Sequence, residues 1–531
     1  MIAVLVPWIA CLSLTGSSFV ELDPDPVTGV WKGTLTGKGE FFPESGVPAS
    51  FWLTLDDERV TGAMAFQGFE VAQLEGAFDE AENRWSIAGQ ARGAPVTAHL
   101  AVTGDELEGE VVGLGQSFPV HARRIAASVL PEPISPAAPV NLATLTEQAW
   151  LDDLRFLAQY LPQVHAHAFH STSQDDWNDA VTALVTRLPE LDGTAKAIAL
   201  AQLVARVGDA HTELHWRELP GFAGVPVRFE AFADGVFVTA VDARWESVLG
   251  AEVLEIGRRS ARRALDAVAT VFAAENDSWR VEKGLGNLAI PGLLSALDVS
   301  SLGSAVPLIV ETRAGEELEV LIESVGSTTW RQLPDPGSDA TPRVRRRQNE
   351  RYWSEPMTSV ETGGAAALYW AYNSCAEDPE RPMQAFLDDL LKTFDDAGAE
   401  RLILDLRNNS GGNSAVLSQH LPLLFERCGA EAIAVLIGPT TYSSGMMNAH
   451  QLRERGATLF GTPTGGKPNS YGELRSFRLP ASGLRVFYST KYFRMLEDDP
   501  PAVEPDVLVE PRAADVFAGR DPVLEAALAH D

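Results

Sequence analysis

The sequence is poor in cysteine and in positive charge. It holds three cysteines, and the two beyond the N-terminal segment, Cys375 and Cys428, are too few for a disulfide framework. We expect both to be packed free thiols, although the sequence does not determine whether they pair. Lys and Arg number 42 against 73 Asp and Glu, which gives a net charge of -31. This excess argues against nucleic acid or an anionic membrane as the partner. The hydrophobic share of 45% still allows the chain to build cores.

The apolar N-terminal segment, Ile2 to Leu14, is too short to cross a bilayer, which takes about 20 residues. It suits the hydrophobic part of a secretory signal, with Gly16 and Ser18 as small residues before a cleavage point, although no Lys or Arg precedes it. We therefore expect a signal peptide at 1–18, no transmembrane segment, and a secreted, periplasmic or cell-envelope protein. The alternatives are a misassigned start codon and a buried first strand.

The next part of the chain reads as all β. Residues 24–125 contain short alternating runs separated by Gly, Asp and Asn turns, which is typical of a small barrel or sandwich. Residues 126–143 are rich in Pro and Ala and are expected to form a linker. Residues 144–216 show helical periodicity, for example at Trp150, Leu154 and Leu157, which predicts a helical subdomain.

The C-terminal part, residues 355–531, has apolar runs that end at glycines, which indicates an α/β core. The run from Leu402 stops at Gly411 and Gly412, a second run precedes Thr441 to His450, and a third precedes Gly461 to Lys467. Together these three segments offer a hydroxyl, an amine and a pocket of backbone N–H donors. A plain strand-to-helix loop is the alternative for any one of them.

A serine in such a site needs a base, because its hydroxyl is a poor nucleophile at neutral pH. Lys467 lies 24 residues beyond Ser443 and is a plausible base if desolvation lowers its pKa. The N–H groups of Gly411 or Gly412, with that of Ser444, are candidate donors to an oxyanion, because glycine allows close backbone approach. A helix beginning near Asn413 would add its dipole.

In order and spacing, these three segments resemble the core of the carboxyl-terminal processing (tail-specific) serine peptidases. The wider superfamily includes the tricorn core protease and the interphotoreceptor retinoid-binding protein. The likeness extends to Val207–Thr212, which is similar to an Asp-x-His-Thr element, and to Leu161–Phe169. It implies a ClpP/crotonase-like α/β core and an inserted PDZ-like α+β region at 217–333. That region is degenerate, because Gly250-Ala-Glu replaces the usual Gly-Asp.

The resemblance also implies roles for single residues. Its register selects Ser443 as the nucleophile, three positions before an acidic residue, but Met446 stands at the acidic position here. Lys467 would be the base. His211 is the rival base, as in the tricorn-like branch. The alternative is that His211 has a structural role and pairs with Asp209 or with the backbone. The tricorn-like arrangement also uses a late acidic residue, but a solvated acidic turn is the favoured account of these four residues: Glu497, Asp498, Asp499 and Glu504.

The resemblance therefore implies a serine-type endopeptidase that cleaves a peptide or protein through a Ser-Lys or Ser-His acyl-enzyme mechanism. No cofactor and no metal are expected. His165, His167 and His170 lack the further ligands of a tetrahedral set, and a structural turn is favoured there. The cluster from Arg343 to Arg347 is expected in an exposed loop. A non-catalytic ligand-binding protein and a small-molecule esterase or amidase remain alternatives, and the substrate and oligomeric state stay open.

Overall fold

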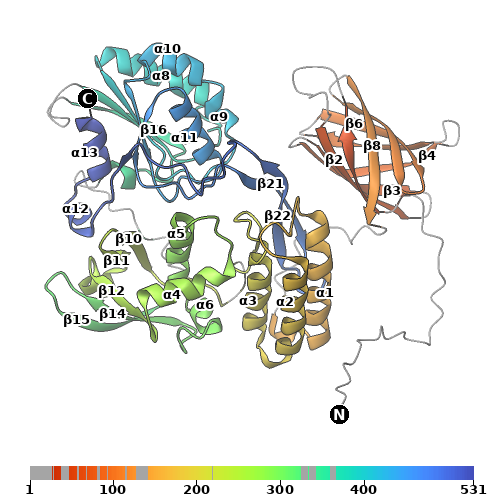
Figure 1. The fold of residues 1–531 in the computed structure, drawn as a ribbon, viewed down its shortest axis with the longest axis horizontal. Helices are drawn as coiled ribbons and strands as arrows, with labels where there is room; N and C mark the ends of the chain where they lie inside the picture. The colour runs from red at the N-terminus through yellow and green to blue at the C-terminus, as the bar shows by residue number, and fades with distance from the viewer. Residues whose placement is uncertain are drawn as a thin grey trace, which may run out of the picture. The chain divides into compact units, whose positions relative to one another are not determined.

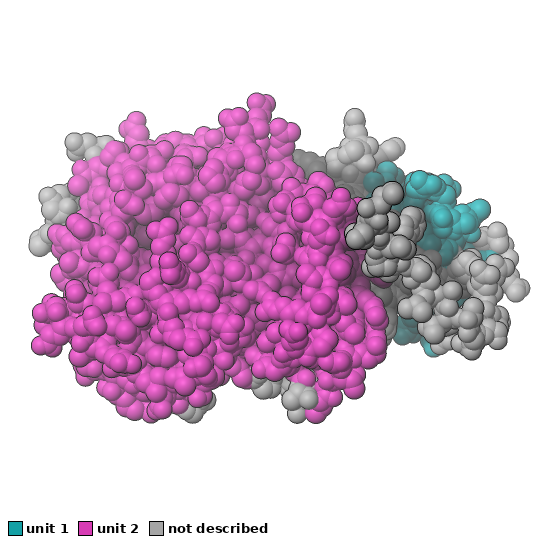
Figure 2. Space-filling model, turned by 60° about the horizontal axis from the view of Figure 1, so that its bottom comes forward, with its two compact units in different colours: residues 1–133 teal, residues 134–531 magenta. Residues whose placement is uncertain are grey.

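The computed structural model describes residues 27, 29–36, 47–56, 59–66, 69–79, 84–91, 94–113, 116–126, 142–217, 219, 221–324, 333, 342–358 and 366–530. The chain divides into two compact units, residues 1–133 and residues 134–531, which Figure 2 colours separately. The expected signal peptide and nearly all of the expected linker lie outside the described residues. Within the described ranges, no helix is long and apolar enough to cross a membrane.

The first unit is a closed antiparallel barrel in which each strand pairs with the next and β8 pairs with β1 (Figure 1). Alternate residues point inward, so that Trp31, Phe51, Ile87 and Leu100 lie in one buried core. The all-β prediction is confirmed, in its barrel form. The strands are β1 (Gly29–Leu35), β2 (Val47–Asp56), β3 (Arg59–Phe66), β4 (Phe69–Asp79), β5 (Arg84–Ala91), β6 (Ala94–Thr103), β7 (Glu106–Gly113) and β8 (Gln116–Ala126).

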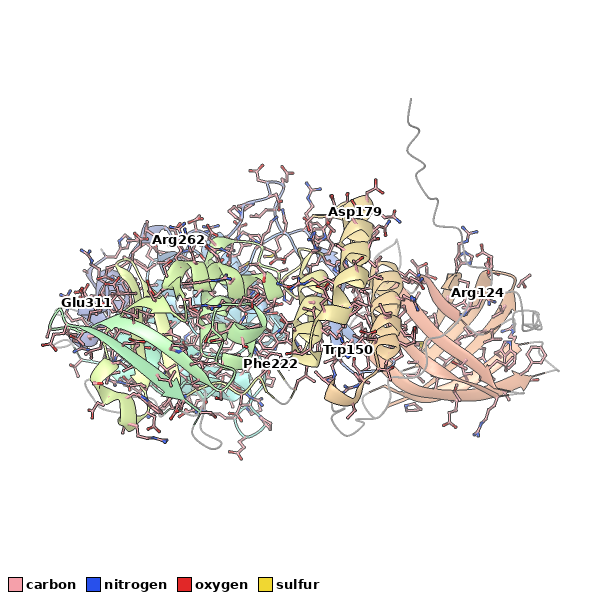
Figure 3. All side chains as sticks on the ribbon, turned by 90° about the horizontal axis from the view of Figure 1, so that it is seen from below. Arg124, Trp150, Asp179, Phe222, Arg262 and Glu311 are labelled. Carbon is pink, nitrogen blue, oxygen red and sulfur yellow. The ribbon has the colours of Figure 1, made fainter. Side chains whose placement is uncertain are left out.

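The second unit begins with three helices, α1 (Glu147–Val164), α2 (Gln174–Arg187) and α3 (Gly193–Ala205), with short 3-10 turns at Leu142–Thr144 and Leu188–Glu190. Thr146, Ser173 and Asp192 cap them, each accepting a backbone N–H three residues on. Figure 3 labels Trp150 on α1, where it is buried. The predicted helical periodicity is confirmed here.

An antiparallel sheet with three helices follows. The sheet order is β10-β11-β12-β14-β15, with β13 paired to β12. Figure 3 labels Arg262 on α4 and Glu311 on β14. The strands are β10 (Val227–Phe232), β11 (Gly235–Val241), β12 (Glu252–Ile256), β13 (Arg259–Ser260), β14 (Ala305–Glu311) and β15 (Glu317–Glu323), and the helices are α4 (Ala261–Val268), α5 (Asp277–Leu288) and α6 (Pro291–Ala296), with 3-10 turns at Ala243–Val248 and Ala269–Val271.

The central sheet has the order β16-β17-β18-β19-β20-β23, and it is parallel from β17 to β23. Its strands read as continuous apolar runs because both faces are buried. Helices α8, α10 and α11 cover one face and α13 covers the other (Figure 1). The strands are β16 (Tyr352–Met357), β17 (Ala367–Tyr372), β18 (Arg401–Asp405), β19 (Ile433–Ile437), β20 (Thr458–Gly461) and β23 (Val507–Leu508), and the helices are α8 (Met383–Asp396), α9 (Ala415–Ser418), α10 (Leu421–Cys428), α11 (Ser444–Glu454), α12 (Ala513–Phe517) and α13 (Pro522–Ala529).

A small sheet ties the helical segment to the central core. The long hairpin of β21 (Ser470–Arg478) and β22 (Arg485–Phe493) pairs with the short β9 (Glu213–Leu214), through Val486 with Leu214 and Phe487 with Glu213. The chain that leaves α3 is therefore fixed by a hairpin that follows β20. This pairing brings residues just before β9 to the carboxyl edge of the central sheet.

Two expectations about charge and sulfur are settled by side-chain contacts. We expected an exposed loop here, but the side chains of Arg343 and Arg345 are largely buried. Their guanidinium groups pair with Glu355 and Glu230 around the 3-10 turn Arg343–Arg345.

Cys375 and Cys428 are free thiols, as expected. Burial raises the pKa of each to about 11, so neither is a thiolate at neutral pH.

Candidate active site

Ser443 occupies a strained turn between β19 and α11. Its backbone has φ 49° and ψ -123°, a conformation that costs a non-glycine residue roughly 1–3 kcal/mol and that surrounding contacts must hold. The Thr441 hydroxyl supplies such contacts, since it donates to the carbonyl of Leu406 at 2.9 Å and accepts the N–H of Gly438 at 3.0 Å. The turn places Ser443 directly before the first residue of an eleven-residue helix.

The structure brings His211 to Ser443. The imidazole Nε2 lies 3.2 Å from the Ser443 hydroxyl, although 232 positions separate the two residues. The neighbouring Ser444 hydroxyl turns away and donates to the carbonyl of Gly412 at 2.8 Å. Of the paired serines, Ser443 is therefore the one in contact with a base, since a proton acceptor must lie within hydrogen-bond reach.

Asp209 anchors the backbone that carries His211. Its carboxylate is fully buried, and one oxygen accepts the backbone N–H of His211 at 2.9 Å. The other oxygen lies 3.0 Å from Nε2 of His165 and accepts the Thr212 hydroxyl. Burial alone would raise the pKa of this carboxyl, but the hydrogen bond from His165 and the electrostatic interaction with the nearby His211 side chain outweigh it and hold the pKa well below its usual range. Asp209 thus stays charged and fixes the loop.

Of the three histidines after α1, His165 contacts Asp209, and His167 and His170 form hydrogen bonds within the same segment. The backbone N–H of His167 donates to Nδ1 of His165 at 3.0 Å, so the proton of His165 lies on Nε2, facing Asp209. His170 contacts the carbonyl of His167 through Nδ1 at 2.9 Å. The sequence drew attention to this segment but did not reveal that His165 binds Asp209.

An aromatic pair completes the surroundings of His211. The Tyr442 hydroxyl lies 3.1 Å from His211 Nδ1, whereas the nearest Asp209 oxygen lies 3.8 Å from it. The indole of Trp279, from α5, stacks on the Tyr442 ring with centroids 4.0 Å apart and planes 8° apart. Sequence reasoning missed both residues. The position of Tyr442 beside Ser443 was the only signal, and Trp279 belongs to no motif.

Glu275 is a third residue near His211 that the sequence did not reveal. Its Oε2 is buried and has no hydrogen-bond partner among the described residues. Burial raises the pKa of Glu275 to about 7, opposed in part by His211. Asp209, His211 and Glu275 have ligand atoms within 4.8 Å of one another, as a metal site requires. Both Asp209 oxygens already accept hydrogen bonds, however, so a metal would have to displace those donors.

Two backbone N–H groups beside Ser443 are available to an oxyanion. The N–H of Gly411 donates to Asn409 Oδ1 at 3.0 Å, so it is engaged. Within the described residues, the N–H groups of Gly412 and Ser444 have no acceptor. Gly411 instead allows its loop to lie close to the turn of Ser443, because a Cβ on Gly411 would lie only 2.8 Å from the Ser443 Cβ. The helix that adds its dipole is α11, since α9 begins at Ala415 and has only four residues.

Lys467 does not contact Ser443. Its ammonium pairs with Asp499 at 2.8 Å, near the surface. The sequence favoured Lys467 over His211 as the base, whereas in the structure it is His211 that lies within hydrogen-bond reach of Ser443. Met446, at the position where the family pattern has an acidic residue, is buried in the apolar core under α11. The other late acidic residues lie exposed, as a solvated turn requires: Glu497, Asp498 and Glu504.

No family model and no curated protein matches the sequence. Among solved structures, mature CPAF complexed with lactacystin matches with a TM-score of 0.51 and 15% identity, over 70% of this chain and 96% of that chain. Another structure of mature CPAF gives 0.50 and 15%, over 72% and 96%. A serine-to-alanine mutant of CPAF gives 0.52 and 14%, over 70% and 95%. At these identities the likeness shows the fold alone, which is CPAF-like.

Proposed function

We propose that the chain is a serine-type endopeptidase of the tail-specific protease family, acting through an acyl-enzyme with Ser443 as the nucleophile and His211 as the base. The observation that carries the proposal is the 3.2 Å contact between His211 Nε2 and the Ser443 hydroxyl at a strained turn. The CPAF-like fold supports it. The proposal includes a ClpP/crotonase-like core at 355–531 and a degenerate PDZ-like region at 217–333.

In the first half of the reaction, Ser443 Oγ attacks the peptide carbonyl carbon and its proton passes to His211 Nε2. The carbonyl oxygen gains the negative charge and accepts the N–H groups of Gly412 and Ser444, which are free in the described part of the chain. Nε2 then gives its proton to the leaving amine as the C–N bond breaks. In the second half, water gives a proton to His211 Nε2 and attacks the acyl carbon. Nε2 then returns that proton to Ser443 Oγ as the ester bond breaks, which releases the carboxylic acid and restores Ser443.

The test is labelling of the full chain by a fluorophosphonate, followed by peptide mapping and by hydrolysis assays on a peptide library. Label on Ser443, abolished in Ser443→Ala, is the expected result. Ser444→Ala should lose activity only modestly, because its hydroxyl bonds to a carbonyl and its N–H remains. Hydrolysis of small esters without any peptide cleavage would favour the esterase alternative. An inert wild-type protein that binds an apolar ligand would favour the binding alternative.

We also propose export of the protein, with removal of residues 1–18. The apolar segment from Ile2 to Leu14 and the small residues that follow it support this proposal. Mass spectrometry of the mature N-terminus is the measurement. An intact Met1 in a cytosolic fraction would contradict it.

A further inference from the structure

We propose that the Tyr442 hydroxyl, rather than a carboxylate, is the group that holds the His211 ring in its working orientation. Tyr442 would then be a positioning residue. This inference rests on the proposed function, because it concerns the base of that reaction. It gives a role to a residue that lies in the predicted segment Thr441 to His450 but to which the sequence assigned none.

Among the described residues, no carboxylate oxygen lies within hydrogen-bond distance of the His211 ring, although Asp209 and Glu275 are both near it. A catalytic histidine needs a partner at Nδ1, since that hydrogen bond fixes which nitrogen carries the proton. The Tyr442 hydroxyl lies 3.1 Å from Nδ1. The nearer Asp209 oxygen is 3.8 Å away and already accepts the His211 backbone N–H at 2.9 Å. Asp209 therefore holds the backbone of His211, and Tyr442 holds its ring.

The positions of the protons follow from these contacts. For Nε2 to take the Ser443 proton, it must begin as an acceptor, so the proton of neutral His211 lies on Nδ1 and is donated to the Tyr442 oxygen. Burial and the charge of Glu275 raise the pKa of Tyr442 well above its usual value, so the phenol keeps its own proton. No proton leaves Tyr442 in any step. The proton from Ser443 moves to Nε2 and then to the leaving amine, while Nδ1 remains protonated throughout.

Tyr442 is itself held through its backbone and through its ring. Its backbone N–H donates to the carbonyl of Asn409 at 3.0 Å, and Trp279 stacks on its face. Trp279 is fixed in turn because the side-chain oxygen of Asn276, the N-cap of α5, accepts the backbone N–H of Trp279 at 2.8 Å. The Asn276 amide also donates to three core carbonyls, those of Thr464, Gly465 and Pro501. The inserted region thus braces the tyrosine from outside the central sheet.

The test compares Tyr442→Phe with the wild type in steady-state hydrolysis of a short peptide across pH. The change removes one oxygen and keeps the stacked ring. We expect kcat to fall on the order of 10- to 100-fold, as for other groups that orient a functional histidine, with little change in KM. The acid limb of the pH profile should move to lower pH, because protonated His211 loses an acceptor. Tyr352→Phe is the matched control, since that hydroxyl donates to the carbonyl of Arg381 at 2.7 Å and accepts the N–H of Asp378 at 2.9 Å, and neither residue belongs to the site.

The outcomes separate this inference from the proposed function. If Ser443→Ala is dead and Tyr442→Phe keeps the kcat and pH profile of the wild type, the inference is overturned while the peptidase proposal stands. If Ser443→Ala stays active, the peptidase proposal fails. If Tyr442→Phe does not fold, ¹⁵N-histidine NMR of the wild type can show which ring nitrogen of His211 carries the proton. The His211 signals are assigned by their absence in His211→Gln. A neutral His211 protonated at Nδ1 is expected, and one protonated at Nε2 would overturn the inference.

Discussion

His211 and Lys467 compete for one role, and the difference between them is geometric. His211 contacts the Ser443 hydroxyl, whereas the ammonium of Lys467 pairs with an exposed Asp499. We expect His211→Ala to lose at least about 100-fold in kcat, the range of a general base. Lys467→Met should keep most of the activity and melt within a few degrees of the wild type, because a surface ion pair contributes about 0–1 kcal/mol. Kinetics with a short peptide and thermal melts measure both effects. A dead Lys467→Met beside an active His211→Ala would restore the lysine mechanism.

Glu275 should lower the free energy of unfolding as the pH rises, because its pKa is raised in the folded protein. A carboxyl whose pKa rises from 4.5 to about 7 on folding binds its proton more tightly in the folded state. The resulting penalty is absent below about pH 4.5, grows until about pH 7 and is constant above that. Three charged or titratable groups also act on the pKa of Glu275: His211 and Lys467 lower it, and Asp209 raises it.

Glu275→Gln removes that titration. Relative to the wild type, we expect the variant to gain up to about 3 kcal/mol of unfolding free energy between pH 4.5 and pH 8, at about 1.4 kcal/mol per pKa unit. Urea unfolding at the two pH values measures it. Glu504→Gln, at an exposed position, controls for the loss of one negative charge. A difference between Glu275→Gln and the wild type that does not change with pH would mean that Glu275 titrates normally.

At the scale of elements, the loop between β18 and α9 must pass very close to the turn that carries Ser443. Gly411 has φ 112°, and a Cβ there would lie 2.8 Å from the Ser443 Cβ and 3.0 Å from the Ser444 nitrogen. We expect Gly411→Ala to displace this turn and to abolish fluorophosphonate labelling. Gly398→Ala is the matched control, because Gly398 also has positive φ, at 59°, but a Cβ there meets nothing within 4 Å. If both variants label as the wild type does, the two loops are not held together as the structure shows.

Much of the element-level architecture could be predicted from the sequence. Strands β18, β19 and β20 are short, mainly apolar runs, of which β19 ends before Gly438 and β20 ends at Gly461. Parallel strands bring their carboxyl ends to one edge of a sheet. Contacts between distant elements could not be predicted in this way. Trp279 meets Tyr442 only because α5 packs against the core, and periodicity carries no information about that packing. The direction of Lys467 is equally invisible, because a lysine on a loop has many rotamers and its partner Asp499 lies 32 residues away.

At the scale of the whole molecule, the chemistry and the barrel belong to different compact units. The barrel has its own core around Trp31 and Phe51, and every residue assigned a role in the site lies between His165 and Lys467, in the second unit. This division limits what the barrel can contribute to catalysis on a short peptide. Its contribution would instead concern capture or anchoring of a larger substrate.

Deletion of the chain up to about Pro139 tests this division. The second unit keeps its central sheet, its helices and the β21–β22 hairpin that fixes the His211 loop, so we expect a truncated protein that still unfolds cooperatively and largely retains hydrolysis of a short, unstructured peptide. Cleavage of a folded protein substrate should fall, because such a substrate has to be captured before it is cut. The measurement compares full-length and truncated chains on both substrates, with thermal melts alongside. Loss of short-peptide cleavage in a truncation that melts cooperatively would show that the barrel helps to build the site. A truncation that no longer melts cooperatively would show instead that the second unit does not fold alone.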